Sequence, residues 1–316
     1  MFIDTHIDTL WAMRKQEREF HQSSEKGHVD LRRAQSADLL CGFFTGFPSD
    51  GHYRTEMMLS NWIKMVNDPR NKLWRIESMD DIKVLIDSRK RTTNISDREI
   101  GIVLHFEGAS GIDTDLNRLY IYHDVGLRSM SLTWNEENFF ATGQAQGENR
   151  GLTEAGKDLL SSMEDLGIII DVSHLNDRSF WDVLSNTNSP ILASHSNIRE
   201  LADSRRNLTV EMAQALVDTG GSIGVNLYKG FLNTEAEKAS SNDALQMYEK
   251  IIEIGGTSSV HSGADLDGAT LPSDMKDITS LPPLLNRVQE ELILPEDDMQ
   301  KIRHGNVMRV MKHYWD

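Results

Sequence analysis

The sequence predicts an α/β fold of the (β/α)8 TIM-barrel class. Eight short runs rich in β-branched and aromatic residues alternate with longer segments in which apolar residues recur at spacings of three and four. Such alternation is typical of parallel strands joined by helical crossovers, and eight units are enough to close a barrel. In addition, histidines and carboxylates follow several of the apolar runs directly, as expected where barrel strands end at an active site.

The predicted strands are short apolar runs, and the predicted helices are the amphipathic segments between them. The strands cover residues 1–8, 39–47, 100–107, 129–133, 167–174, 191–195, 222–226 and 259–265. The helices cover residues 56–66, 79–90, 115–124, 153–166, 177–184, 210–219 and 243–254. Residues 139–151 are rich in Gly, Gln and Asn, and we expect them to form a long loop over one end of the barrel.

Length and composition favour one domain over residues 1–316. A chain of 316 residues with 39% hydrophobic residues can bury a large core, and one barrel with insertions fits this length as well as two domains do. We find no internal repeat and no low-complexity linker that would divide the chain.

Charge and cysteine content bear on partners and compartment. The formal net charge of −16 argues against a nucleic-acid partner or an anionic membrane, because both need a basic surface. The single cysteine, Cys41, excludes an internal disulfide and indicates a reducing compartment. Asp4 and Asp8 interrupt the apolar N-terminal stretch, and no basic segment comes before it, so we expect no secretion signal. No apolar run approaches the ~20 residues that cross a bilayer. We therefore expect a cytoplasmic protein.

A His-x-Asp pair, His6 and Asp8, lies in the first predicted strand. Residues i and i+2 of a strand face the same way, so both side chains can bind one metal ion. Glu107, His174, His195 and Asp265 stand where four later strands end, and a barrel brings such ends into one crater.

This set of residue types predicts a two-metal hydrolase. Imidazole and carboxylate ligands suit zinc, and a carboxylate can bridge two ions. Paired ions can share a hydroxide that attacks an amide carbonyl, and Asp265 would then carry the proton. The predicted ligands of two Zn²⁺ ions are His6, Asp8, Glu107, His174 and His195.

Four nearby residues compete for these roles. His105 faces the same way as Glu107 but about one layer deeper, so we expect a packing role for it. Asp171 precedes His174 by three residues, so strand alternation turns it to the opposite face, where a structural hydrogen bond is its expected role. Asp267 is an alternative to Asp265 as the proton carrier. Arg205 is an alternative to its neighbour Arg206 as a binding residue.

A series of motifs spans nearly the whole chain. In order they are Asp4-Thr5-His6-Ile7-Asp8 with Trp11, Phe106-Glu107-Gly108, Ser131-Leu132-Thr133, Asp171-Val172-Ser173-His174, Ser194-His195-Ser196, Arg206-Asn207, Gly263-Ala264-Asp265-Leu266-Asp267-Gly268 and Gly305-Asn306-Val307-Met308-Arg309-Val310. Together they resemble the membrane dipeptidase (renal dipeptidase) family, peptidase family M19, within the amidohydrolase-like metal-dependent barrels.

The resemblance assigns roles to these positions. It implies that His6, Asp8 and Glu107 bind one zinc, and that Glu107 also bridges to a second zinc held by His174 and His195. It further implies that Arg206 binds the terminal carboxylate of the substrate and that Asp265 moves the proton, in preference to Arg205 and Asp267. Tyr228 and Trp11 fall where the family has aromatic residues lining the substrate pocket.

One position departs from the family pattern. Mammalian members have Leu-Thr-His where this chain has Leu132-Thr133-Trp134. Trp134 can donate one hydrogen bond but carries no charge, and Asn135 could supply a donor in its place. We expect hydrolysis to survive and the specificity to differ.

The predicted activity is hydrolysis of the amide bond of L,L- or L,D-dipeptides, since the resemblance implies tolerance of a D-residue at the C-terminal position. A homodimer is an open possibility, because family members are often dimeric. The alternatives are an amidohydrolase acting on N-acyl amino acids, β-lactams or cyclic amides, and a metal-binding barrel that has lost catalysis. His-x-Asp and Glu107, in place of the His-x-His and bridging lysine of many such amidohydrolases, count against the first alternative.

Overall fold

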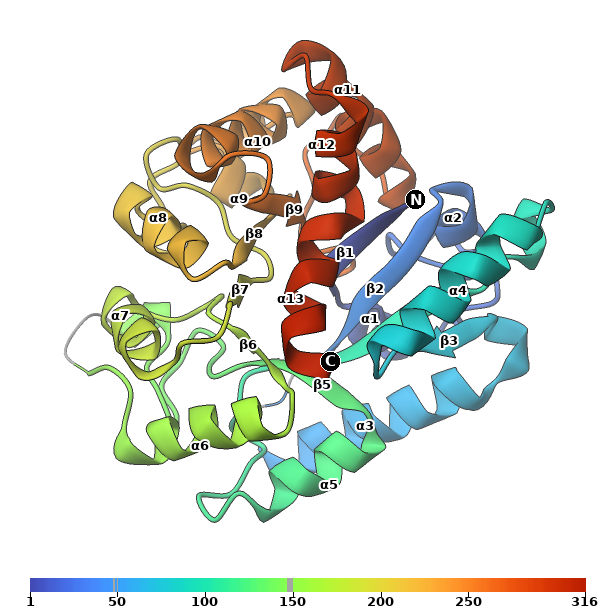
Figure 1. Ribbon diagram of the computed structural model, residues 1–316. Helices are drawn as coiled ribbons and strands as arrows, with labels where there is room; N and C mark the ends of the chain where they lie inside the picture. Colours follow the sequence, from blue (N-terminus) through green and yellow to red (C-terminus); the bar gives the residue numbers. More distant parts are fainter. Residues whose placement is uncertain (48, 50, 147–149) are drawn as a thin grey trace.

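Eight parallel strands close a barrel surrounded by helices in the computed structural model (Figure 1). The structure describes residues 1–47, 49, 51–146 and 150–316, so residues 147–149 of the predicted loop 139–151 lie outside the described residues. The barrel strands are β1 (Phe2–Ile7), β2 (Leu39–Gly46), β4 (Ile100–Glu107), β5 (Leu127–Ser131), β6 (Ile169–Asp171), β7 (Leu192–Ala193), β8 (Ser222–Val225) and β9 (Val260–Ser262). They pair in that order, and β9 pairs again with β1. The predicted (β/α)8 TIM barrel is confirmed.

The later strands are shorter than the sequence predicts, because side chains replace part of their backbone pairing. At the end of β6, Asp171 Oδ1 accepts hydrogen bonds from the backbone N–H of Ser173 at 3.0 Å and of Ser194 at 2.8 Å. At the end of β9, the carboxylate of Asp4 accepts from the N–H of Ala264 at 3.0 Å. These side chains satisfy buried donors, so the backbone can leave the sheet and turn toward the barrel mouth.

A ninth strand, β3 (Leu73–Arg75), is missing from the sequence prediction. It pairs with Ile100–Ile102 of β4, while β5 pairs with the same strand only from Leu104 onward. With three residues, β3 is too short to show the alternation by which strands are recognised. It extends the edge of β4 outside the closed barrel.

The seven predicted helices are confirmed with shifted ends. They are α3 (His52–Asn67), α4 (Met79–Arg91), α5 (Asn117–Val125), α6 (Glu154–Asp165), α7 (Asp177–Asn186), α8 (Val210–Asp218) and α10 (Ser241–Gly255). Further helices were not predicted, namely α1 (Thr9–Gln16), α2 (Leu31–Ser36), α9 (Lys229–Leu232), α11 (Leu281–Glu291), α12 (Glu296–Gln300) and α13 (Asn306–Trp315). Most of these are short or carry a broken apolar pattern, which explains why periodicity did not reveal them.

The last helix, α13, closes one end of the barrel. In Figure 1 it crosses in front of the strands, whereas other helices surround them. Val310 and Met311 of this helix are fully buried in a cluster with Ile3, Phe43 and Val103 from the strands. Polar strand-end residues gather at the opposite end, which therefore stays open for a site. No helix among the described residues has both the length and the apolar composition needed to cross a bilayer.

Candidate metal centre

Six side chains that the sequence singles out meet at the open end of the barrel. His6 lies in β1 and Glu107 is the last residue of β4, whereas the others lie in the turns that follow their strands. Asp8 follows β1, His174 follows β6, His195 follows β7 and Asp265 follows β9. Barrel closure, and not sequence proximity, brings them together.

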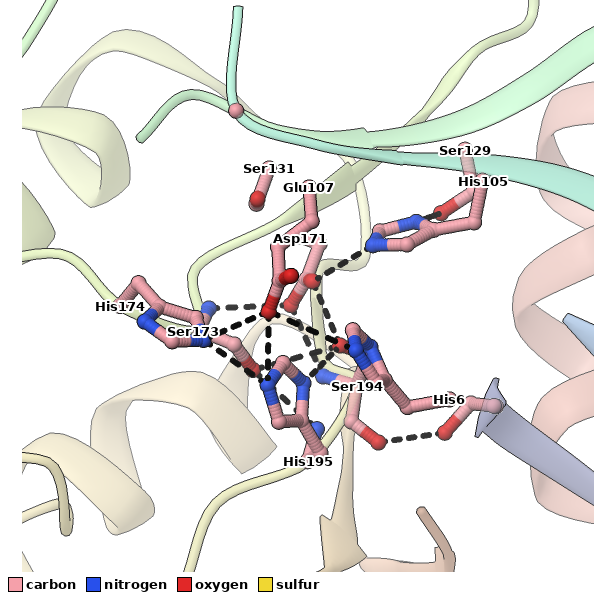
Figure 2. Close-up of polar contacts among 12 residues, drawn as sticks. His6, His105, Glu107, Ser129, Ser131, Asp171, Ser173, His174, Ser194 and His195 are labelled. Atoms are coloured by element: carbon pink, nitrogen blue, oxygen red, sulfur yellow. Dashed lines mark hydrogen bonds and ion pairs between the residues drawn. The ribbon is translucent and has the colours of Figure 1, made fainter. Parts of the chain in front are cut away.

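Glu107 lies at the centre of the histidines. Its Oε1 atom lies 2.8 Å from His174 Nε2 and 3.4 Å from both His6 Nε2 and His195 Nε2, and Figure 2 shows these side chains converging. The Nε2 atoms of His174 and His195 are only 3.0 Å apart. Asp8 Oδ2 approaches His6 Nε2 to 3.5 Å from the other side. One carboxylate oxygen thus faces three imidazoles.

The ligand atoms of this cluster fit a metal ion. Potential ligand atoms of His6, Glu107 and His195 all lie within 4.8 Å of one another, and so do those of His6, Asp8 and Asp265. Neither ring nitrogen of His6, nor Asp8 Oδ1, has a hydrogen-bond partner among the described residues, although all three atoms are buried. Buried polar atoms without partners are costly, and coordination of a cation would satisfy them.

Burial shifts the pKa values of these groups strongly. It raises the pKa of the Asp8 and Asp265 carboxyls to about 7 and that of Glu107 well above its ordinary value. It lowers the pKa of His6 to about 4 and holds the pKa of His174 and His195 well below the usual range. The imidazoles are therefore neutral and ready to act as ligands, and a dication would supply the charge that lets the carboxyls ionise.

His174 reaches the centre through an unusual backbone conformation. It has φ 72° and lies between the end of β6 at Asp171 and Asn176, which caps α7 by accepting from the N–H of Ser179. Asn135 Oδ1 lies 2.8 Å from His174 Nδ1 and also accepts from Gln144 Nε2 at 3.0 Å. Because a carbonyl oxygen only accepts, Nδ1 carries the proton, and Nε2 is left with a free lone pair that faces the centre of the cluster.

The prediction that Asp171 and His174 face opposite sides is wrong. Alternation ends with β6 at Asp171, and the positive φ of His174 turns that side chain back toward the centre. Asp171 is itself interior and also accepts from Ser194 Oγ at 2.5 Å, so its expected hydrogen-bonding role is observed (Figure 2). His105 lies beside it, with Nδ1 3.0 Å from Ser129 Oγ and Nε2 3.6 Å from Asp171 Oδ2.

The structure separates the two aspartates of the loop after β9. Asp265 points into the site and accepts from Asn226 Nδ2 at 3.1 Å. Asp267 instead accepts from Thr9 Oγ1 at 2.6 Å and from Arg18 Nη2 at 2.7 Å. Both residues have positive φ, 58° and 68°, so the loop is tightly turned and alternation does not apply to it.

Arg206 is the buried member of the arginine pair, whereas Arg205 is exposed. Its Nη2 lies 2.6 Å from His195 Nε2 and donates to His195 O at 3.1 Å, and its Nη1 donates to Ser196 Oγ at 3.1 Å. The guanidinium therefore lies at the edge of the cluster, next to His195.

Two adjoining cavities open over the cluster. The main cavity, of about 420 Å³, is lined by Asp8, Trp11, Phe47, Glu107, Trp134, Asn135, Gln144, His174, Tyr228, Phe231, Asp265, Gly268 and Ala269. The side cavity, of about 280 Å³, is lined by Trp11, Phe47, Ser49, Arg54, Glu107, Gly108, Ser110 and Trp134.

Four of the five residues predicted to contact substrate line the main cavity, namely Trp11, Trp134, Asn135 and Tyr228. The fifth, Arg206, does not line it. Sequence analysis missed Phe47 and Phe231 as cavity residues. Phe47 could have been selected from the sequence, because it is the last residue of the second predicted strand and barrel strands end at the site.

Comparison with known proteins gives consistent matches along the chain. Residues 1–314 match the family model described as "Membrane dipeptidase (Peptidase family M19)". An uncharacterized dipeptidase of Schizosaccharomyces pombe is 27% identical over 337 aligned residues, which cover 98% of this chain and 79% of that protein. An uncharacterized protein in the pqqA 5' region of Klebsiella pneumoniae is 34% identical over 232 residues, which cover 69% of this chain and 84% of that protein.

Among solved structures, a metallo peptidase from Rhodobacter sphaeroides has a TM-score of 0.86 to this chain. It is 26% identical, and the match covers 99% of each chain. That crystal structure is liganded with a phosphinate mimic of the dipeptide L-Ala-D-Ala.

Proposed function

This chain belongs to the membrane dipeptidase family, peptidase family M19, and from that premise we propose that it is a dizinc hydrolase of L,L- or L,D-dipeptides. The observation that carries the proposal is the convergence of three neutral imidazoles on one oxygen of Glu107, with Asp8 and Asp265 beside them. The phosphinate dipeptide mimic bound to the Rhodobacter sphaeroides relative supports a dipeptide as the substrate class and L,D stereochemistry as one option.

In this proposal His6, Asp8 and Glu107 hold one zinc, and Glu107, His174 and His195 hold the other. The paired ions would supply Lewis acidity to the scissile carbonyl and lower the pKa of the attacking water. Glu107 faces all three imidazoles, and its carboxylate would be the ligand shared between the two ions.

Asp265 is the proposed proton carrier. It lines the main cavity, and burial raises the pKa of its carboxyl above the ordinary value of an aspartate, which makes it a stronger proton acceptor than an exposed carboxylate. The side-chain amide of Asn226 donates to one carboxylate oxygen of Asp265 at 3.1 Å and so holds this carboxyl in the site. Asp265 would accept the proton of the attacking water and donate it to the leaving amine.

Arg206 is the proposed partner of the substrate's terminal carboxylate. A guanidinium can bind a carboxylate through two parallel hydrogen bonds, which selects a substrate with a free C-terminus. His195 Nε2 has one lone pair, so its use as a metal ligand ends the 2.6 Å contact with Arg206 Nη2. That donor then becomes available to the substrate.

The proposal is tested with protein stripped of metal and then given two equivalents of zinc. Release of free amino acids is measured on a panel of L,L-, L,D- and D,D-dipeptides and N-acyl amino acids. We expect zinc-dependent cleavage of dipeptides, and a loss of at least about a hundredfold in kcat for Glu107→Gln and for Asp265→Asn. Binding of two zinc ions without cleavage of any dipeptide would contradict the proposal, and cleavage of N-acyl amino acids alone would support the amidohydrolase alternative.

A further inference from the structure

Three aromatic side chains, Trp11, Phe47 and Trp134, line both cavities over the candidate metal centre, and we refer to them as the aromatic wall. The ring centroids of Trp11 and Phe47 are 6.3 Å apart, and those of Phe47 and Trp134 are 5.3 Å apart. Trp134 is 41% exposed although it is large and apolar, so much of its ring faces open space. Exposed apolar surface beside a reaction centre is a feature that substrate contacts often explain.

The order of the strands places the side cavity across the barrel from the arginine. Its lining follows β2, β4 and β5, through Phe47, Gly108 and Trp134. Arg206 and Tyr228 follow β7 and β8, and in a closed ring of eight strands β7 stands opposite β2 and β8 opposite β4. A dipeptide whose carboxylate binds Arg206, and whose amide lies at Glu107, therefore directs its amino-terminal residue toward the side cavity.

The side cavity has the size and chemistry for one apolar side chain. Its volume of about 280 Å³ is at the lower limit of the ~300–1,000 Å³ typical of small-molecule pockets. Glu107 and Arg54 are its charged residues among those described, and Arg54 is exposed. Two serines, Ser49 and Ser110, also line it. The Ser49 hydroxyl is already engaged, since it lies 2.6 Å from Glu107 O and 2.8 Å from Gly108 O. The remaining large surfaces are the rings of the aromatic wall.

We propose that the aromatic wall selects dipeptides whose amino-terminal residue has a large apolar side chain, and that Trp134 is the main determinant of this selection. The inference rests on the proposed dipeptidase activity and adds the substrate class to it. A polar side chain of equal size would lose its water on entering the cavity and would find few hydrogen-bonding partners there. An apolar side chain would instead bury its surface against three rings.

The test compares L-Leu-L-Ala with L-Asn-L-Ala, because these two amino-terminal side chains have nearly the same shape and differ in polarity. For the zinc-loaded wild-type protein we expect kcat/KM to be at least about tenfold higher for L-Leu-L-Ala. Trp134→Ala should lower this ratio by about tenfold, mainly through a higher KM for the leucine substrate. Trp181→Ala is the matched control, since Trp181 is 42% exposed on α7 and lines neither cavity. It should leave the ratio unchanged.

Phe47→Ala is a second variant, which tests the wall even if Trp134→Ala fails to fold. It should also lower the ratio. A wild-type ratio near one, or an unchanged ratio in whichever of the two wall variants folds, would overturn the inference while leaving the dipeptidase proposal intact. If the wild-type protein cleaves neither these two dipeptides nor any other, the dipeptidase proposal itself fails.

Discussion

Asn135 determines how His174 is presented to the centre. Its Oδ1 lies 2.8 Å from His174 Nδ1 and so fixes the proton on that nitrogen. We expect Asn135→Ala to weaken zinc binding by about 10–100-fold, because ligand orientation and basicity depend on such partners. Asn135→Asp keeps an oxygen acceptor at this position and should retain most of the affinity. Competition with a zinc chelator measures both, and equal affinities in Asn135→Ala and wild type would contradict this role.

The buried carboxyls Asp8 and Glu107 make zinc binding dependent on pH. Burial raises the pKa of Asp8 to about 7 and that of Glu107 well above its ordinary value, so the metal-free protein holds protons on them at acidic pH, and these protons must leave when a cation binds. The apparent affinity should therefore rise as pH increases through about 7. Calorimetry at pH 6 in buffers of different ionisation enthalpy should show release of at least about one proton per protein. No proton release at pH 6 would show that these carboxyls are already ionised without metal.

At the scale of elements, the loop after β9 depends on a buried ion pair. Asp267 bonds Arg18, Thr9 and the backbone N–H of His28, and so ties this loop to α1 and to the segment that follows it. The side chains of Arg18 and Asp267 are 4% and 0% exposed, so removing one charge leaves the other buried without its partner. Arg18→Met should therefore lower the free energy of unfolding by about 3–5 kcal/mol.

The same change should lower kcat, because Asp265 lies two residues from Asp267 in this loop. Arg14→Met is the control, since Arg14 is exposed at the end of α1 and should change stability by less than about 0.5 kcal/mol. Denaturant unfolding and steady-state kinetics measure the two effects. Equal stability of both variants would show that the ion pair does not hold the loop.

Elements with long, regular patterns could be predicted from the sequence, whereas short or irregular ones could not. Residues 100–107 are predicted with the bounds that β4 has in the structure, because the run is mostly apolar and ends at Glu107. The strand predicted over residues 167–174 is too long, since β6 ends at Asp171. There the carboxylate of Asp171 accepts the hydrogen bonds of backbone N–H groups that would otherwise pair with a neighbouring strand. α13 escaped prediction although it is amphipathic, and its burial against Ile3 and Phe43 becomes evident only in three dimensions.

At the scale of the whole molecule, barrel closure explains why the candidate site was easier to predict than its details. Alternating strands and helices imply that distant strand ends meet, so polar residues at those ends could be selected without coordinates. Contacts made by residues in the loops after the strands could not be predicted in this way. The left-handed turn at His174 and the hydrogen bond from Asn226 to Asp265 arise from loop geometry that no periodicity encodes. The homodimer, the single domain over residues 1–316 and the cytoplasmic location stay predictions from the sequence.

Metal removal should destabilise the whole barrel, because the candidate ligands come from four different strand ends. The ligands follow or end β1, β4, β6 and β7, and Asp265 adds β9 to the same cluster. A ligand that binds only the folded state adds stability of about 2.7 kcal/mol when its free concentration is a hundred times Kd. Thermal unfolding should therefore occur at lower temperature after treatment with a chelator, and two equivalents of zinc should restore the original Tm.

In Glu107→Gln, which lacks the proposed bridging carboxylate, the chelator and the added zinc should both have a much smaller effect. A Tm that is insensitive to the chelator in the wild-type protein, with zinc shown by elemental analysis to have been removed, would mean that the barrel is stable without ions and that zinc serves only the chemistry.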